Sequence, residues 1–72
     1  MKELYCIKSI NTNVFVKDIK DSEVILTSEF NNVLSFDKIG EAIIIAAQTN
    51  ELLGTTVFKV LPYSDTTVSN NS

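Results

Sequence analysis

The sequence has no arginine, histidine or tryptophan, and it contains one cysteine, one proline and two glycines. Without histidine, proton transfer would depend on a carboxylate or a lysine with a shifted pKa, which a small core rarely provides. Cys6 has no second thiol to pair with and no imidazole to activate it, so we expect a small buried or edge residue. The two glycines form no phosphate-binding loop. We therefore expect no enzyme activity, no metal and no cofactor.

The absence of arginine also bears on the partners of the protein. Its charges are six lysines and nine acidic residues, a net charge of −3. Arginine is the usual bidentate reader of phosphate and guanine, and lysine offers only a point charge. Nucleic-acid binding is therefore not expected. The longest apolar run, residues 42–47, is far shorter than the roughly 18 to 20 residues that span a bilayer, and the first residues lack the apolar stretch of a signal peptide. We expect a cytoplasmic protein without membrane contact.

The composition itself is that of a folded protein. Hydrophobic residues make up 44% of the 72 residues and charged residues 21%, values typical of soluble globular domains. A chain of this length supports one domain. We predict a single domain over residues 1–63 and a disordered polar tail over residues 64–72.

Alternating apolar and polar residues predict four strands. Residues 4–10, 14–19 and 24–30 read as an antiparallel meander, with turns at the asparagine-rich residues 11–13 and at the polar residues 20–23. Leu26 and Phe30 are expected to point into the core. Residues 55–61 read as the last strand, and Pro62 ends it because proline has no backbone N–H to donate.

A helix is predicted between the third and fourth strands. Asp37 or Ser35 would cap its start, and Gly54 would close it after Leu53 in the left-handed conformation. Gly40, in the first turn, is expected to mark close packing against the sheet. The sequence thus predicts a small α+β domain of order ββ(β)αβ, in which an antiparallel sheet of three to four strands carries one α-helix on one face.

A helical wheel at 100° per residue places one apolar stripe toward the sheet. Ile44 and Ile45 fall on its two flanks, with Leu52 beside Ile45. In one interpretation, Ile44 packs under residues 31–34 and Ile45 is a simple exposed hydrophobe. In the interpretation that we favour, Ile44, Ile45 and Leu52 form an apolar patch that contacts a second copy or a target protein. The predicted inward stripe comprises Ile39, Ala42, Ile43, Ala46 and Leu53, with Ala47 and Asn50 at its margin.

Three acidic residues, Asp18, Asp21 and Glu23, gather around the second turn. Their spacing is not that of a calcium-binding EF-hand loop, and two lysines accompany them, Lys17 directly before Asp18 and Lys20 directly before Asp21. They are interpreted as a solvated hairpin tip or, as an alternative, as a secondary electrostatic contact that could imitate phosphates. Strand 14–19, if it lies at a sheet edge, is a further candidate for pairing with another chain.

The segment Ser35-Phe36-Asp37, a helix that carries Ala42 and a closing strand "VFKVLP" together resemble the layout of small proteins from bacteriophages and prophages of low-GC Gram-positive bacteria. The resemblance covers about Leu4 to Leu61. Such proteins with assigned roles tend to bind and inhibit or redirect a host protein, and they include anti-CRISPR proteins. The resemblance implies a non-catalytic protein–protein interaction module in the host cytoplasm.

The partner would be a second copy or a host protein, and no small-molecule substrate is expected. Two alternatives remain: a structural or assembly protein with no regulatory target, and a nucleic-acid-associated accessory protein. The accessory protein would use Lys2, Lys8, Lys17, Lys20 and Lys59.

Overall fold

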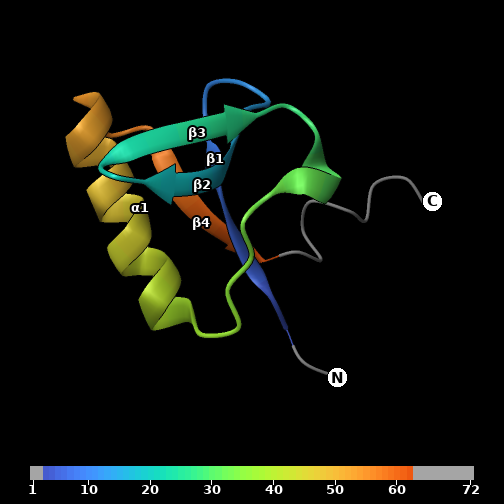
Figure 1. The fold of residues 1–72 in the computed structure, drawn as a ribbon. Helices are drawn as coiled ribbons and strands as arrows, with labels where there is room; N and C mark the ends of the chain where they lie inside the picture. Colours follow the sequence, from blue (N-terminus) through green and yellow to red (C-terminus); the bar gives the residue numbers. More distant parts are fainter. Residues whose placement is uncertain (1–2, 63–72) are drawn as a thin grey trace.

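Residues 3–62 are described here in a computed structural model of the chain, which contains four antiparallel strands and one α-helix (Figure 1). The strands are ordered β3-β2-β1-β4 in one sheet. This confirms the predicted α+β class and the order ββ(β)αβ. No helix within residues 3–62 has both the length and the apolar character needed to cross a membrane. The predicted tail, residues 64–72, lies outside the described residues. The elements are β1 (Tyr5–Ser9), β2 (Phe15–Lys20), β3 (Glu23–Thr27), the 3₁₀ turn η1 (Phe30–Asn32), α1 (Ile39–Leu53) and β4 (Phe58–Pro62).

The connection between β2 and β3 is a two-residue turn. Asp21 and Ser22 both have positive φ, 52° and 65°, as a type I′ hairpin turn requires. Strand β3 ends at Thr27, earlier than predicted, and Phe30 then begins η1. The ring of Phe30 is half-buried and packs edge-on against Phe15, with the ring centroids 5.7 Å apart. The hairpin is thus fixed by turn geometry at one end and by an aromatic contact at the other.

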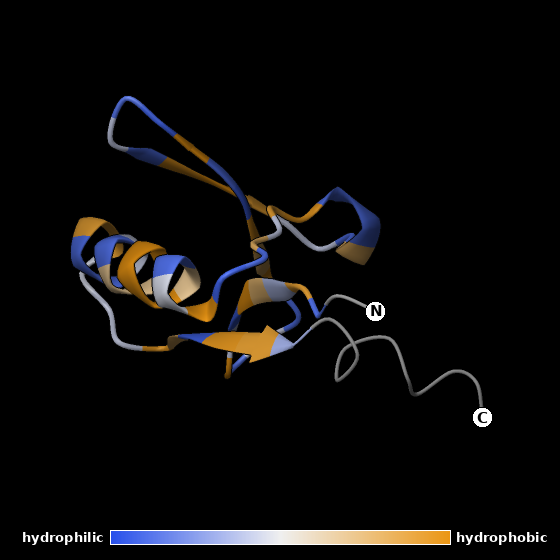
Figure 2. Ribbon diagram, turned by 90° about the horizontal axis from the view of Figure 1, so that it is seen from below, coloured by the Kyte–Doolittle hydropathy of each residue, from blue (hydrophilic) through white to orange (hydrophobic). Residues whose placement is uncertain are grey.

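The sheet opens between β1 and β2. The pairing of β2 with β3 shifts register between Val16 and Asp18, a bulge that includes Lys17. Past Val16, the segment that follows η1 lies beside β1. The N–H of Leu34 donates to the carbonyl of Val16 at 3.0 Å, and Tyr5 and Phe36 exchange two backbone hydrogen bonds of 2.8 and 2.9 Å. Because β2 has left β1 there, the hairpin β2–β3 bends over the helix. Figure 2 shows α1 lying between this hairpin and β4.

The core lies between α1 and the concave side of the sheet. At its centre are Ile7, Val16, Ala46 and Phe58, all buried. Cys6 is also fully buried, as predicted. The helix packs mainly on β4 and β1 and also touches β3. This placement leaves the far edge of the sheet incompletely covered, so the prediction that Leu26 points into the core is wrong, and Leu26 is exposed. The half-buried residues around the core are Val14, Ile19, Val24, Leu34, Phe36, Ile45, Val57 and Val60.

The two ends of α1 differ in how well the sequence predicted them. The N-cap is Lys38, with φ −126° and ψ 124°, and no side chain caps the helix by a hydrogen bond. The predicted caps, Asp37 and Ser35, are wrong because the bridge between Tyr5 and Phe36 keeps the chain in the sheet up to Phe36. At the other end the prediction is confirmed. Gly54 has φ 66°, its N–H donates to the carbonyl of Glu51, and the N–H of Thr55 donates to the carbonyl of Asn50. These bonds form a Schellman motif.

Candidate interaction surface

The buried face of α1 consists of small residues. Ala42, Ala46 and Thr49 are buried, and the half-buried Ile45 packs against the same core. Their spacing, i, i+3, i+4 and i+7, is that of one helical face. Thr49 can be fully buried because its hydroxyl donates to the carbonyl of Ile45 at 2.9 Å, so its polar group keeps a partner. Small side chains let the helix lie close to the sheet.

The helical wheel was therefore wrong about several residues. Ile39, Ile43 and Leu53 were predicted to face the sheet and are exposed. Ile45 was predicted to lie in an exposed patch and instead packs against the core. The wheel was right about Ala42 and Ala46, which are buried as predicted, but it did not include Thr49, which is buried too. Val24 of β3 packs against the same core as Ile45, and β3 touches α1.

This orientation leaves an apolar surface on the other side of the helix. The side chains of Ile39, Ile43 and Ile44 are 50%, 54% and 67% exposed. Gly40 and Ala47 are exposed too, and at about 100° per residue they fall between the isoleucines. A Cβ added at Gly40 would meet no atom within 4 Å, so the prediction that Gly40 marks close packing is wrong. We call these five residues (39, 40, 43, 44 and 47) the outer helix face.

Only one of the three predicted helical contact residues lies on this face. Ile44 is exposed there, as predicted. Leu52 is 39% exposed, but about 80° around the helix from Ile44, and Ile45 is in the core. The prediction missed Ile39 and Ile43. The i, i+4, i+8 series formed by residues 39, 43 and 47 is the sequence signal that could have identified them. Figure 2 shows hydrophobic stretches on successive turns of α1.

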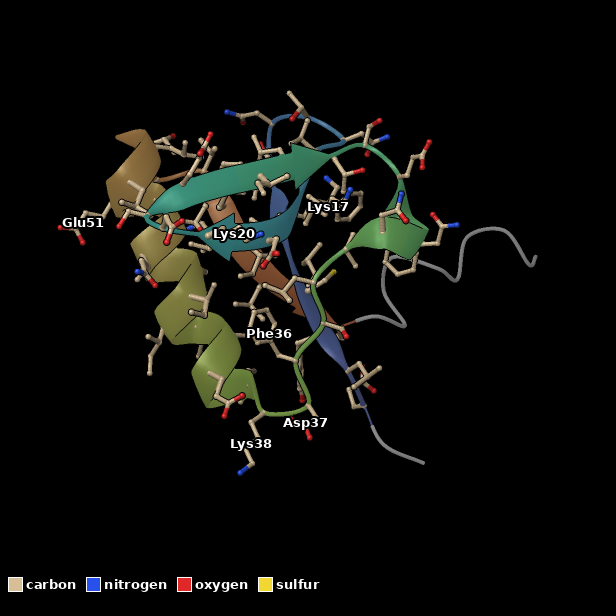
Figure 3. The ribbon with its side chains drawn as sticks, in the orientation of Figure 1. Lys17, Lys20, Phe36, Asp37, Lys38 and Glu51 are labelled. Carbon is tan, nitrogen blue, oxygen red and sulfur yellow. The ribbon has the colours of Figure 1, made fainter. Side chains whose placement is uncertain are left out.

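The charged residues of α1 are acidic. Glu41 and Glu51 are both exposed. Lys38 and Glu51 lie at opposite ends of the helix and point away from the sheet (Figure 3). The outer helix face is therefore apolar at its centre and acidic beside it, with one lysine before its first turn.

The three predicted acidic contact residues are all exposed on the hairpin β2–β3. Asp18 accepts the N–H of Ile19 at 2.8 Å, Asp21 is in the turn, and Glu23 is the cross-strand partner of Lys20. Within residues 3–62, no three His, Cys, Asp or Glu side chains are grouped so that they could hold a metal ion. These acids share one hairpin, and none of them is on the helix.

The lysines are spread over the sheet. The Nζ of Lys8 donates to the carbonyls of Ser9 and Thr12, each at 3.0 Å, and so binds the end of β1 and the loop that follows it. Lys59 on β4 is the cross-strand partner of Lys8. Lys17 and Lys20 belong to β2 (Figure 3). Lys2 lies outside the described residues.

The sheet edges are not the ones that the sequence suggested. Strand 14–19 was treated as a candidate edge, but β2 pairs with both β1 and β3 and is internal. The edges are β3 and β4. Strand β4 returns beside β1, so β3 lies at the opposite edge of the sheet.

No protein-family model, curated protein or solved structure matches this chain.

Proposed function

We propose that this protein is a non-catalytic protein–protein interaction module whose contact surface is the outer helix face. The observation that carries the proposal is the exposure of Ile39, Ile43 and Ile44 on one side of α1, half or more of each side chain. Burying the exposed part of such an isoleucine contributes about 1 kcal/mol. These three isoleucines, which lie within six residues of α1, therefore provide a driving force for association that this domain does not use internally.

The chemistry of the face indicates what kind of partner would fit. Residues at i, i+4 and i+8 on an exposed helix suit a hydrophobic groove on another protein. Glu41 and Glu51 are exposed on the same helix, and the whole chain carries a net charge of −3. A groove with an apolar floor and a basic rim would complement both properties. The acidic hairpin residues Asp18, Asp21 and Glu23 would add a secondary electrostatic contact.

The layout resemblance to small proteins of bacteriophages and prophages supports a host protein as the partner. On this proposal the protein acts in the cytoplasm of a Gram-positive host and inhibits or redirects its target by occupying the groove, as an anti-CRISPR protein would. No residue is assigned a chemical step.

The experiment compares two substitutions of the same chemistry. Ile44→Lys places a charge on the outer helix face, and Ile10→Lys places the same charge on an isoleucine that is 61% exposed in the loop after β1. The tagged proteins are expressed in a low-GC Gram-positive host, and the proteins recovered with each are quantified by mass spectrometry. We expect one host protein to be recovered with the wild type and with Ile10→Lys, and lost with Ile44→Lys.

Equal recovery with both variants would place the contact elsewhere on the molecule. Circular dichroism and urea unfolding of both variants provide the control, since neither isoleucine is in the core and both proteins should unfold as the wild type does, within about 0.5 kcal/mol.

A further inference from the structure

The two edges of the sheet differ in how they are protected. Strand β4 ends in Pro62, which has no N–H, and carries the exposed Lys59. Both features discourage pairing with another strand. Strand β3 contains neither proline nor lysine, and its three central residues are Val24, Ile25 and Leu26. The bulge of this sheet involves Lys17 of β2 and leaves β3 regular.

The hydrogen-bonding groups of β3 alternate between its partner and its open side. Glu23 closes the two-residue turn opposite Lys20, and Ile25 lies opposite Asp18. In an antiparallel ladder, residues that bond to the partner alternate with residues that do not. Val24 and Leu26 therefore direct their N–H and C=O groups away from β2, toward the edge of the sheet.

We propose that β3 pairs with β3 of a second copy of this chain, antiparallel and about a twofold axis at Ile25. In this register Val24 of each copy faces Leu26 of the other, and their outward N–H and C=O groups are in phase for four hydrogen bonds. The two Ile25 side chains form the close, non-hydrogen-bonded pair at the centre. Glu23 faces Thr27, so no like charges meet.

The side chains of β3 suit a second copy of the same strand. Ile25 and Leu26 are 37% and 41% exposed and, being adjacent in a strand, point to opposite faces of the sheet. Pairing of β3 with itself therefore places apolar side chains beside each other on both faces. An isologous contact of this kind closes on itself and yields a dimer, not a fibre. The dimer has an eight-stranded sheet and two outer helix faces, which it presents to partners as a bivalent surface.

The first test acts on the backbone. Leu26→Pro removes an N–H that points to the open edge and leaves the bonds between β2 and β3, and Leu26→Thr is the matched control that keeps the N–H. Analytical ultracentrifugation measures the dimer dissociation constant of each purified full-length protein. We expect Leu26→Pro to raise it about tenfold or more relative to Leu26→Thr, because the dimer loses two hydrogen bonds, one from each copy.

The second test acts on side chains and holds even if the proline variant unfolds. Ile25→Lys and Ile25→Glu each place two like charges at the twofold axis, so each variant should be monomeric. Mixing the two should restore a dimer that contains one copy of each, because Lys then faces Glu.

Several outcomes would overturn the proposal. A wild-type protein that stays monomeric up to millimolar concentration would do so, even if it bound an added foreign strand. So would a dimer that survives both Ile25 substitutions, or one that only Ile44→Lys disrupts, since the contact would then be the outer helix face. If Ile44→Lys abolishes host-protein recovery and leaves the dimer intact, the result supports both the outer helix face as the host contact and β3 as the dimer contact. The two proposals are therefore tested separately.

Discussion

The side-chain amide of Asn50 pairs with the backbone of Phe58 through two hydrogen bonds. Its Nδ2 donates to the carbonyl of Phe58 at 3.1 Å, and its Oδ1 accepts the N–H of Phe58 at 3.0 Å. Asn50 belongs to the last turn of α1 and Phe58 is the first residue of β4. The amide therefore makes the pair of hydrogen bonds that a neighbouring strand would make, and it connects the end of α1 to the start of β4.

Asn50→Ala should lower the free energy of unfolding by about 2 kcal/mol, because both backbone groups of Phe58 lose their partner next to a buried ring. Urea denaturation followed by circular dichroism measures the change. Gln48→Ala, an exposed polar residue of the same helix, is the control and should change stability by less than about 0.5 kcal/mol. Equal effects of the two substitutions would show that the amide pair contributes nothing.

The two glycines should respond to alanine in opposite directions. Gly54→Ala should destabilise the protein by about 1 kcal/mol, because the φ of +66° is unfavourable for a residue with a Cβ. Gly40→Ala should stabilise it by up to about 1 kcal/mol, since Gly40 is helical and a Cβ there meets no atom within 4 Å. Thermal unfolding of both variants measures whether each substitution raises or lowers the stability of the protein. A destabilising Gly40→Ala would mean that the helix approaches a neighbour at Gly40 after all.

The orientation of α1 is tested by two adjacent isoleucines. Ile45 packs against the core and Ile44 is 67% exposed. Ile45→Ala should cost about 2 kcal/mol of stability, while Ile44→Ala should cost less than about 0.5 kcal/mol. A larger loss of stability for Ile44→Ala than for Ile45→Ala in urea unfolding would contradict this orientation of the helix.

The element order could be predicted from the sequence because each signal was local. Alternation marked the strands, and Gly54 marked the end of the helix. Strand order could not be predicted in this way, since the position of β4 beside β1 depends on pairing between residues far apart in the chain.

The orientation of the helix could not be predicted because the hydrophobicity of its side chains does not follow their burial in this structure. The helical wheel placed Ile39 and Ile43 toward the sheet and left out Thr49, yet Thr49 is buried and its hydroxyl donates to the carbonyl of Ile45. That hydrogen bond depends on the helix and leaves no signal in composition. The orientation of the helix also decides which residues form the outer helix face. Ile44 was predicted to lie on an exposed surface, whereas Ile39 and Ile43 were assigned to the core.

The assignment of the outer helix face as the contact surface is tested most directly by photo-crosslinking at single positions in living host cells. A benzophenone amino acid replaces Ile44 on the outer helix face or, in the matched control, the exposed Ile10. We expect a discrete crosslinked product with one host protein from position 44, absent from position 10, and lost when Ile43→Lys is added. Identical products from both positions, or none from position 44, would contradict the assignment of the outer helix face as the contact surface.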